Sequence, residues 1–167
     1  MLRRVQPTRI QRPDGAFAIV ASRYNARYVD ALLRAAQSEL KRAGAGKAQI
    51  IRVPGAYEIP VAAAQLARAA SSPAARQASG GSRLSAIICL GVILRGETVH
   101  AAHIGEAVSQ ALMKIQLEHG IPVIHEVLLL ENEAQARVRC LDPQHNRGTE
   151  AAQTALEMAR VMEKLCG

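Results

Sequence analysis

The sequence predicts an α/β fold, a three-layer sandwich built on a four-stranded parallel sheet. Four short apolar runs are rich in β-branched residues or leucine and do not alternate with polar residues, which is typical of strands covered on both faces. They occupy residues 16–22, 49–54, 85–94 and 122–130. Helix-length patterns separate them, and this alternation implies right-handed crossovers that place helices on both faces of the sheet.

Helix start and stop residues support this order of elements. Asn25 is expected to cap the first helix, Pro60 fits the first turn of the second, and Gly120 is a stop signal for the third. The expected helices cover about residues 25–44, 60–70, 100–119, 133–140 and 146–165. Residues 69–85 are small, polar and interrupted by Pro and Gly, and predict an exposed loop.

The composition indicates one globular domain, expected at residues 16–167, behind a basic arm at residues 1–15. The chain has 167 residues, of which 49% are hydrophobic, and a net charge of +7. Four of those charges lie in an acid-free start, at Arg3, Arg4, Arg9 and Arg12. We expect a mobile arm, with a short organellar targeting peptide as the alternative. One Phe, three Tyr and no Trp leave few rings to stack on bases, so nucleic acid is not expected as a partner.

The cysteines and apolar runs favour the cytoplasm. Cys89, Cys140 and Cys166 are odd in number and scattered, which is typical of reduced thiols rather than a disulfide framework. The longest apolar run, near residues 87–94, has the length of a strand and is too short to cross a bilayer. No membrane association is expected.

The most informative segment covers residues 86–103, where a buried strand breaks at Arg95 and a helix pattern follows. A turn that leaves a strand and opens a helix presents unpaired N–H groups and the positive end of the helix dipole, which suit a phosphate or carboxylate. Thr98 is expected to cap that helix, and His100 lies in its first turn. An anion site would therefore adjoin a proton-transfer group. The alternative is an ordinary connection with a solvent-facing histidine.

Ligands of parallel α/β sheets bind beyond the carboxyl ends of the strands. The sequence puts Tyr24 and Asn25 after the first strand, residues 55–58 after the second and residues 95–100 after the third. The region after Leu130 follows the fourth strand. We therefore expect the site at this edge of the sheet.

Five motifs in unbroken order resemble the lumazine synthase family over about residues 17–162. The motifs are SRYN at 22–25, VPGAYEIP at 53–60, GVILRGETVH at 91–100, ENEAQARVR at 131–139 and NRGTEAAQTALEM at 146–158. The resemblance implies a flavodoxin-like, doubly wound fold. It also implies condensation of 5-amino-6-(D-ribitylamino)uracil with 3,4-dihydroxy-2-butanone 4-phosphate, releasing phosphate and water, the penultimate step of riboflavin biosynthesis. No metal or organic cofactor is expected.

The resemblance assigns one group of residues to the ribitylaminouracil. Tyr24 takes the position of an aromatic ring that stacks on the pyrimidine, with a core tyrosine as the alternative reading. The other positions matched to this substrate are Ala56, Tyr57, Glu58, Val92, Ile93, Leu94 and His125. Val92, Ile93 and Leu94 would act largely through their main chain.

A second group of residues would serve the butanone phosphate and the chemistry. Glu97 and Thr98 match the phosphate-binding turn, and Glu97 should turn its carboxylate to solvent. Arg139 matches an arginine that clamps the phosphate from a neighbouring subunit, a contact that suits a guanidinium fork. His100 matches the catalytic histidine, whose ordinary pKa of about 6.5 suits proton shuttling near neutral pH.

Several positions depart from the family pattern. Ala101 and Ala102 stand where an aromatic and an acidic residue are usual, so His103 or Glu106 becomes a candidate to orient His100. In the presumed strand at 122–130, His125 replaces a phenylalanine that packs on the pyrimidine, Glu126 replaces a small residue, and leucines replace threonines at 129 and 130. Arg147 replaces a lysine. These changes put affinity and pH dependence in doubt rather than the reaction class.

Two other functions fit parts of the sequence. Glu97, His100, His103 and Glu106 would share a helix face, which with His125 suggests a metal-dependent hydrolase. The departures also fit a non-catalytic protein that binds lumazine or flavin on the same scaffold. The family resemblance instead implies a homopentamer with pockets shared between subunits, sometimes an icosahedral shell of pentamers, and suggests riboflavin synthase as a further partner.

Overall fold

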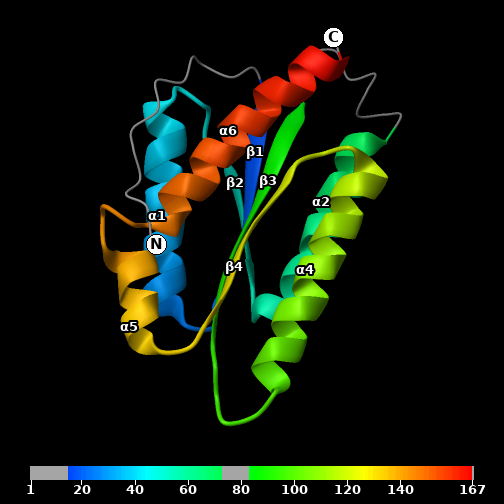
Figure 1. The fold of residues 1–167 in the computed structure, drawn as a ribbon. Coiled ribbons are helices and arrows are strands. Elements are labelled where there is room, and N and C mark those ends of the chain that lie inside the picture. Colours follow the sequence, from blue (N-terminus) through cyan, green and yellow to red (C-terminus); the bar gives the residue numbers. More distant parts are fainter. Residues whose placement is uncertain (1–14, 73–82, 167) are drawn as a thin grey trace.

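The strands form a parallel sheet in the order β2-β1-β3-β4, as in flavodoxin-like folds (Figure 1). The computed structural model describes residues 15–72 and 83–166. The strands are β1 (Ala16–Ser22), β2 (Gln49–Val53), β3 (Leu84–Leu94) and β4 (Val123–Leu130). The predicted α/β class and all four strands are therefore confirmed. The basic arm predicted at residues 1–15 lies outside the described residues except for Gly15.

Helices cover both faces of the sheet, as Figure 1 shows. The helical elements are α1 (Ala26–Arg42), η1 (Ala56–Glu58), α2 (Ile59–Ser71), α4 (His100–His119), α5 (Glu133–Ala136), η2 (Arg137–Leu141) and α6 (Arg147–Cys166). Most of the loop expected at 69–85 lies outside the described residues, but residues 69–71 belong to α2 and 84–85 to β3. Within the described part of the chain, no helix is both long and apolar enough to span a bilayer.

Two apolar clusters fill the space between the layers. One joins β1 and β3 to α1 and α6 through Ile19, Leu32, Ile88 and Leu156, each fully buried. The other packs α2 and α4 on the opposite face of the sheet, around residues such as Ile59, Ile87 and Leu112. A strand covered on both faces needs apolar side chains at every position, which explains the lack of alternation in its sequence.

The helix ends correct two capping predictions. Asn25 precedes α1, but it adopts a left-handed conformation with φ of 55° and its side chain does not cap the helix. Its amide Nδ2 donates to the carbonyl of Val92 on β3 at 2.7 Å. Thr98 also fails to cap α4, which has Val99 at its N-cap, although its hydroxyl accepts the His100 N–H at 3.4 Å. Two asparagines do cap helices with their side chains: Asn132 Oδ1 accepts the Gln135 N–H at 2.9 Å in α5, and Asn146 Oδ1 accepts the Gly148 N–H at 2.9 Å in the first turn of α6.

Asn25 provides a test of how the site edge is held. Asn25→Gly keeps the left-handed conformation and removes only the bond to Val92, and should cost about 1 kcal/mol of unfolding free energy. Asn25→Ala adds a conformational cost of roughly 1–2 kcal/mol. Urea unfolding of both variants measures the difference. Equal stability of Asn25→Ala and wild type would contradict the role given to this bond.

Candidate functional site

The carboxyl ends of β1, β2 and β3 bring the first half of the predicted site together. The Tyr24 N–H donates to the Pro54 carbonyl at 3.0 Å, which joins the turn after β1 to the turn after β2. An ideal Cβ built on Gly55 would lie 3.8 Å from Cδ2 of Tyr24, so the tyrosine ring packs over this glycine. Asn25 then ties the same corner to β3 through Val92. Three segments distant in sequence thus meet at one edge.

The two tyrosines of this corner present their rings to the outside. Tyr24 is 74% exposed and Tyr57 is 64% exposed. The alternative reading of Tyr24 as a core residue is therefore wrong, because a core ring would be covered. Two exposed rings beside a backbone turn suit a flat heterocycle that brings its own apolar surface.

The loop after β2 is stabilised from within. Glu58 Oε2 accepts the Gly55 N–H at 2.8 Å, so one carboxylate oxygen is already used by the loop itself. Ala56 is buried beneath the turn. The family resemblance predicts a role for Glu58 in binding the substrate, and this bond gives Glu58 a structural role, because it stabilises the turn that carries Tyr57.

The ends of β3 and the following turn contribute groups of two kinds. Val92 is buried, and Ile93 and Leu94 are half-buried, so chiefly their main chain is presented at the edge. Glu97, Thr98 and His100 are exposed, in the turn after β3 and at the start of α4. Arg95 beside them pairs with Glu131 at 3.0 Å, which links the turns after β3 and β4.

No hydrogen bond from the described residues orients the imidazole ring of His100. Glu106, one of the two candidates to orient it, accepts from Gln110 at 3.2 Å instead. The backbone N–H of His103 donates to the Val99 carbonyl, and no hydrogen bond joins the imidazole of His103 to that of His100 in the described part of the chain. The described residues also contain no group of three or more His, Cys, Asp and Glu side chains gathered closely enough to hold a metal ion.

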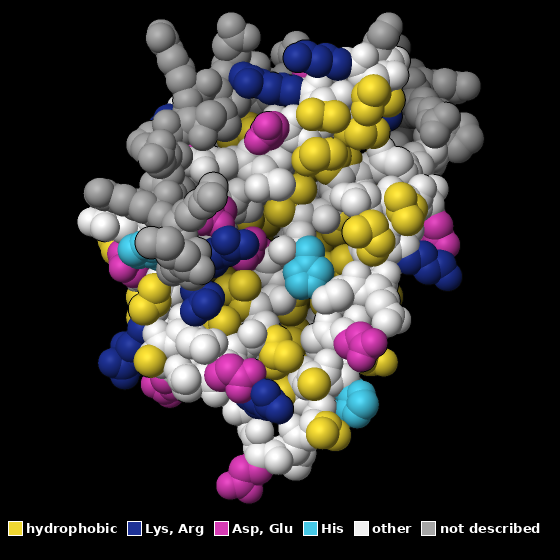
Figure 2. Space-filling view, in the orientation of Figure 1, with side chains coloured by type: hydrophobic (Ala, Val, Ile, Leu, Met, Phe, Trp, Pro, Cys, Tyr) yellow, Lys and Arg dark blue, Asp and Glu magenta, His cyan; other side chains and the backbone are white. Residues whose placement is uncertain are grey.

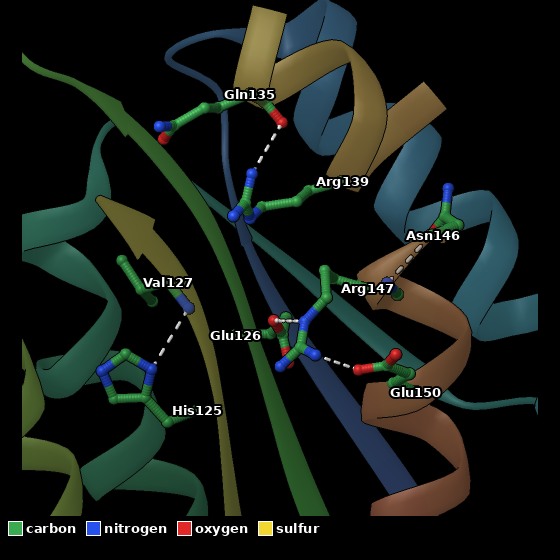
Figure 3. A network of polar contacts seen from close by, with 9 residues as sticks. His125, Glu126, Val127, Gln135, Arg139, Asn146, Arg147 and Glu150 are labelled. Carbon is green, nitrogen blue, oxygen red and sulfur yellow. Dashed lines mark hydrogen bonds and ion pairs between the residues drawn. The ribbon is translucent and has the colours of Figure 1, made fainter. Parts of the chain in front are cut away.

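Arg139 and His100 belong to helices on opposite faces of the sheet. Arg139 lies on η2, whose Cys140 packs in the cluster with α1 and α6, while α4 packs in the cluster with α2. Arg139 Nη1 donates to the Gln135 carbonyl at 3.5 Å, as Figure 3 shows. A single chain therefore does not bring this arginine to the turn at Glu97 and Thr98.

His125 and Glu126 point to opposite sides of β4 (Figure 3). His125 is exposed and lies 2.8 Å from the hydroxyl of Ser109 on α4. Glu126 is buried and accepts from Arg147 on α6 at 2.8 Å, and Arg147 also pairs with Glu150. Burial raises the pKa of the Glu126 carboxyl, and the guanidinium of Arg147 opposes that rise. Glu126 and Arg147, which both depart from the family pattern, thus form one ion pair.

Sequence reasoning missed this ion pair, the Ser109 contact and the π-helical turn of η2. The opposite charges of Glu126 and Arg147, two residues that depart from the family pattern, were a signal in the sequence for this ion pair. Nothing in the sequence marks Ser109, because only the packing of α4 on β4 brings it to the ring. A π-helical turn such as Arg137–Leu141 also has no local signature, although such turns are frequent at functional sites.

Neither buried cysteine can serve as a nucleophile. Cys89 and Cys140 are unpaired and buried. Burial raises the pKa of the Cys140 thiol to about 12, helped by the nearby Glu126 charge, and burial also raises the pKa of Cys89. Because the thiolate is the reactive form, both thiols are inert near neutral pH.

The hollows found in the described part of the chain lie away from the predicted site, and one of about 560 Å³ runs along α4 beside Ser109, Met113 and Leu117. One of about 280 Å³ adjoins Arg83, Gly120 and Met162, and one of about 380 Å³ lies between α1 and the start of α6. Neither includes any of the candidate residues. The exposed edge with Tyr24, Tyr57 and His100 is an open surface rather than an enclosed cleft.

Comparison with known proteins identifies the family. The family model for 6,7-dimethyl-8-ribityllumazine synthase matches residues 14–163. Proteins of that name from Xanthomonas oryzae pv. oryzae (strain PXO99A) and Stenotrophomonas maltophilia (strain R551-3) are each 39% identical, covering 92% and 93% of this chain and 93% and 95% of their own lengths. One from Xanthomonas campestris pv. campestris (strain B100) is 40% identical and covers 92% of this chain and 94% of its own. The chain belongs to the 6,7-dimethyl-8-ribityllumazine synthase family.

Proposed function

We propose that the chain condenses 5-amino-6-(D-ribitylamino)uracil with 3,4-dihydroxy-2-butanone 4-phosphate to form 6,7-dimethyl-8-ribityllumazine, phosphate and water. The observation that carries the proposal is the family match across residues 14–163, which includes every candidate residue. The exposed rings of Tyr24 and Tyr57 suit the pyrimidine. The turn at Glu97 and Thr98, beside the start of a 20-residue helix, suits the phosphate.

The chemistry needs proton transfer and close confinement of two substrates rather than a covalent nucleophile. An amine attacks a ketone, water is lost to give an imine, phosphate is eliminated, and a second attack on a carbonyl closes the ring with loss of a second water. Each step moves a proton, and His100 is the exposed imidazole beside the proposed phosphate turn. Most of the acceleration should come from holding the reactants side by side.

His100 is therefore expected to assist turnover without being indispensable. His100→Ala should lower kcat by about 10²-fold, the low end for a general acid or base, and leave KM for both substrates within a few-fold. Steady-state kinetics followed by the lumazine chromophore measures this, with His119→Ala, at the far end of the same helix, as the control. Complete loss of turnover in a folded variant that still binds both substrates would contradict this role.

We further propose that the pocket is completed by an adjoining copy in a homopentamer. His125 lies on β4 opposite Cys89 of β3, and Arg139 lies on η2, across the sheet from α4 and His100. The α4 side also carries exposed apolar residues suited to a partner, among them Met113 at 55% and Leu117 at 75%, and Figure 2 shows hydrophobic side chains at the surface on that side. Shell assembly of pentamers is an outcome that light scattering and electron microscopy can distinguish from a lone ring.

Subunit mixing tests the shared pocket directly. Tyr24→Ala and Arg139→Ala should each be nearly inactive alone, because each damages one of the two halves that adjoining subunits contribute to every pocket. Mixed oligomers formed by refolding or co-expression should regain activity, since some pockets then join two intact halves. Arg137→Ala, an exposed neighbour of Arg139, is the control and should stay active. No recovery in mixed oligomers, or full activity of a monomer, would contradict the proposal.

The assigned reaction has a simple overall test. Purified protein supplied with both substrates and no added metal should produce the lumazine chromophore and release phosphate in equal amounts. Binding of the aminouracil or of riboflavin with no turnover would instead indicate a binding protein. Activity that depends on a metal found by elemental analysis would indicate the hydrolase alternative.

A cytoplasmic location is part of the same proposal. Cys89 and Cys140 are buried free thiols, and Cys166 is an exposed one. Thiols persist in a reducing compartment, whereas an exposed one is prone to oxidation elsewhere.

A further inference from the structure

The ring of His125 is held at both nitrogens by its own chain. The Val127 N–H donates to Nδ1 over a long contact of 3.4 Å (Figure 3). The Ser109 hydroxyl lies 2.8 Å from Nε2. That hydroxyl also donates to the Gly105 carbonyl at 2.7 Å, one helical turn earlier in α4.

The direction of these bonds fixes one tautomer. A backbone N–H can only donate, so Nδ1 must be the unprotonated acceptor. The single hydroxyl proton of Ser109 is directed to the Gly105 carbonyl, so its oxygen accepts from Nε2–H. The series of hydrogen bonds from Nε2–H to the Ser109 hydroxyl, and from that hydroxyl to the Gly105 carbonyl, forms only with the neutral Nε2–H form of the imidazole.

Packing of α4 on β4 produces this arrangement. His125, Val127 and Leu129 alternate onto the same face of β4. An ideal Cβ on Gly105 would lie 3.6 Å from Cδ2 of Leu129, an ordinary contact distance, so this turn of α4 packs against Leu129 of β4. Ser109, one turn further along α4, then reaches the ring of His125.

We propose that Ser109 is a positioning residue that holds His125 as a neutral, flat surface against the pyrimidine of an adjoining protomer, and that His125 takes no part in proton transfer. The proposal rests on the proposed function and on the shared pocket. With both nitrogens engaged, only the ring face and a C–H edge remain for a neighbour, and these suit stacking. The hydroxyl thus lets an imidazole act as an apolar ring would.

Nitrogen NMR tests the tautomer without any turnover. In full-length protein labelled with ¹⁵N-histidine, and with His125 assigned by its loss in His125→Phe, Nδ1 should resonate as an unprotonated nitrogen and Nε2 as a protonated one. In Ser109→Ala only the long 3.4 Å contact with the Val127 N–H still holds the ring, so the ring should rotate away from it and show a mixture of tautomers, whereas Ser109→Thr, which keeps the hydroxyl, should preserve the single form. Ser71→Ala is the matched control, because its hydroxyl makes the same helical bond to the Ala67 carbonyl at 2.8 Å. A protonated Nδ1 in wild type, or an unchanged ring in Ser109→Ala, would overturn the proposal.

Kinetics tests the consequence for substrate binding. Ser109→Ala should raise KM for the aminouracil about three- to tenfold, the range expected for a disturbed stacking contact, with kcat changed less than twofold. In a His125→Phe background the same substitution should have no effect, because phenylalanine needs no partner. Equal effects in both backgrounds, no effect in either, or a loss confined to kcat would overturn the proposal. If wild type makes no lumazine at all, the proposed function fails, and the NMR result still decides whether Ser109 holds the ring.

Discussion

Replacing Gly148 with alanine is expected to destabilise the protein by about 3 kcal/mol or more, because the new methyl group has no room. An ideal Cβ at this position would lie 2.1 Å from the Leu32 carbonyl oxygen and 2.8 Å from the Leu32 Cα. These are backbone atoms of α1, so no side-chain rotation relieves the overlap and the two helices must separate. Alanine's better helix propensity, worth up to about 1 kcal/mol, cannot compensate.

Gly46→Ala provides the matched control for this substitution. A Cβ at Gly46 would meet nothing within 4 Å, and the residue is exposed between α1 and β2. Its stability should stay within about 1 kcal/mol of wild type. Urea unfolding at one fixed protein concentration compares the two variants, since an oligomer makes stability concentration-dependent. A Gly148→Ala protein as stable as Gly46→Ala would show that α1 and α6 are not packed as closely as described.

Replacing Arg147 with methionine is expected to cost about 3 kcal/mol at pH 8, because it leaves the Glu126 carboxylate buried without its partner. The Glu126 side chain is only 5% exposed, and Arg147 spans from α6 to reach it on β4. Arg137→Met is the control, because Arg137 pairs with Glu133 at the surface over 3.6 Å and should contribute less than about 1 kcal/mol. The double variant Glu126→Gln with Arg147→Met should recover most of the loss, since no buried charge remains.

The pH dependence of this loss has a definite sign. Burial raises the pKa of Glu126 in the folded protein, so the folded state binds a proton more readily than the unfolded chain. Stability contributed by this group is therefore present below the ordinary glutamate pKa of about 4.3 and declines as the pH rises toward the raised value. Without Arg147 the decline should be steeper, so the deficit of Arg147→Met should shrink between pH 8 and pH 5. A deficit independent of pH, or no larger than that of Arg137→Met, would contradict the buried-charge explanation.

The strands and most helix ends could be predicted because they depend on local chemistry. Apolar runs such as residues 85–94 must be covered on both faces, and Gly120 ends α4 in a left-handed conformation with φ of 61° that glycine adopts freely. Pro60 stands in the first turn of α2, where a missing N–H costs nothing. These signals act within a few residues of the feature they determine.

The capping prediction for Asn25 failed because a distant partner takes its side chain. Asn25 has the right residue type at the right place, yet Val92, 67 residues away, takes its amide. Asn132 and Asn146, at positions where no cap was predicted, cap α5 and α6 with their side chains. An asparagine can serve a helix end or a neighbouring strand equally well, and only the position of that strand decides between them.

Local patterns in the sequence establish the order of strands and helices along the chain, the family, and the residue types that stand at the carboxyl edge of the sheet. The tertiary structure alone decided which of those side chains meet: Tyr24 over Gly55, Arg147 on Glu126, and Ser109 against the ring of His125. It also put Arg139 and His100 on helices that cover opposite faces. The reason is physical, because apolar periodicity is a property of neighbouring residues, whereas a hydrogen bond or ion pair depends on how helices and strands distant in sequence pack in space.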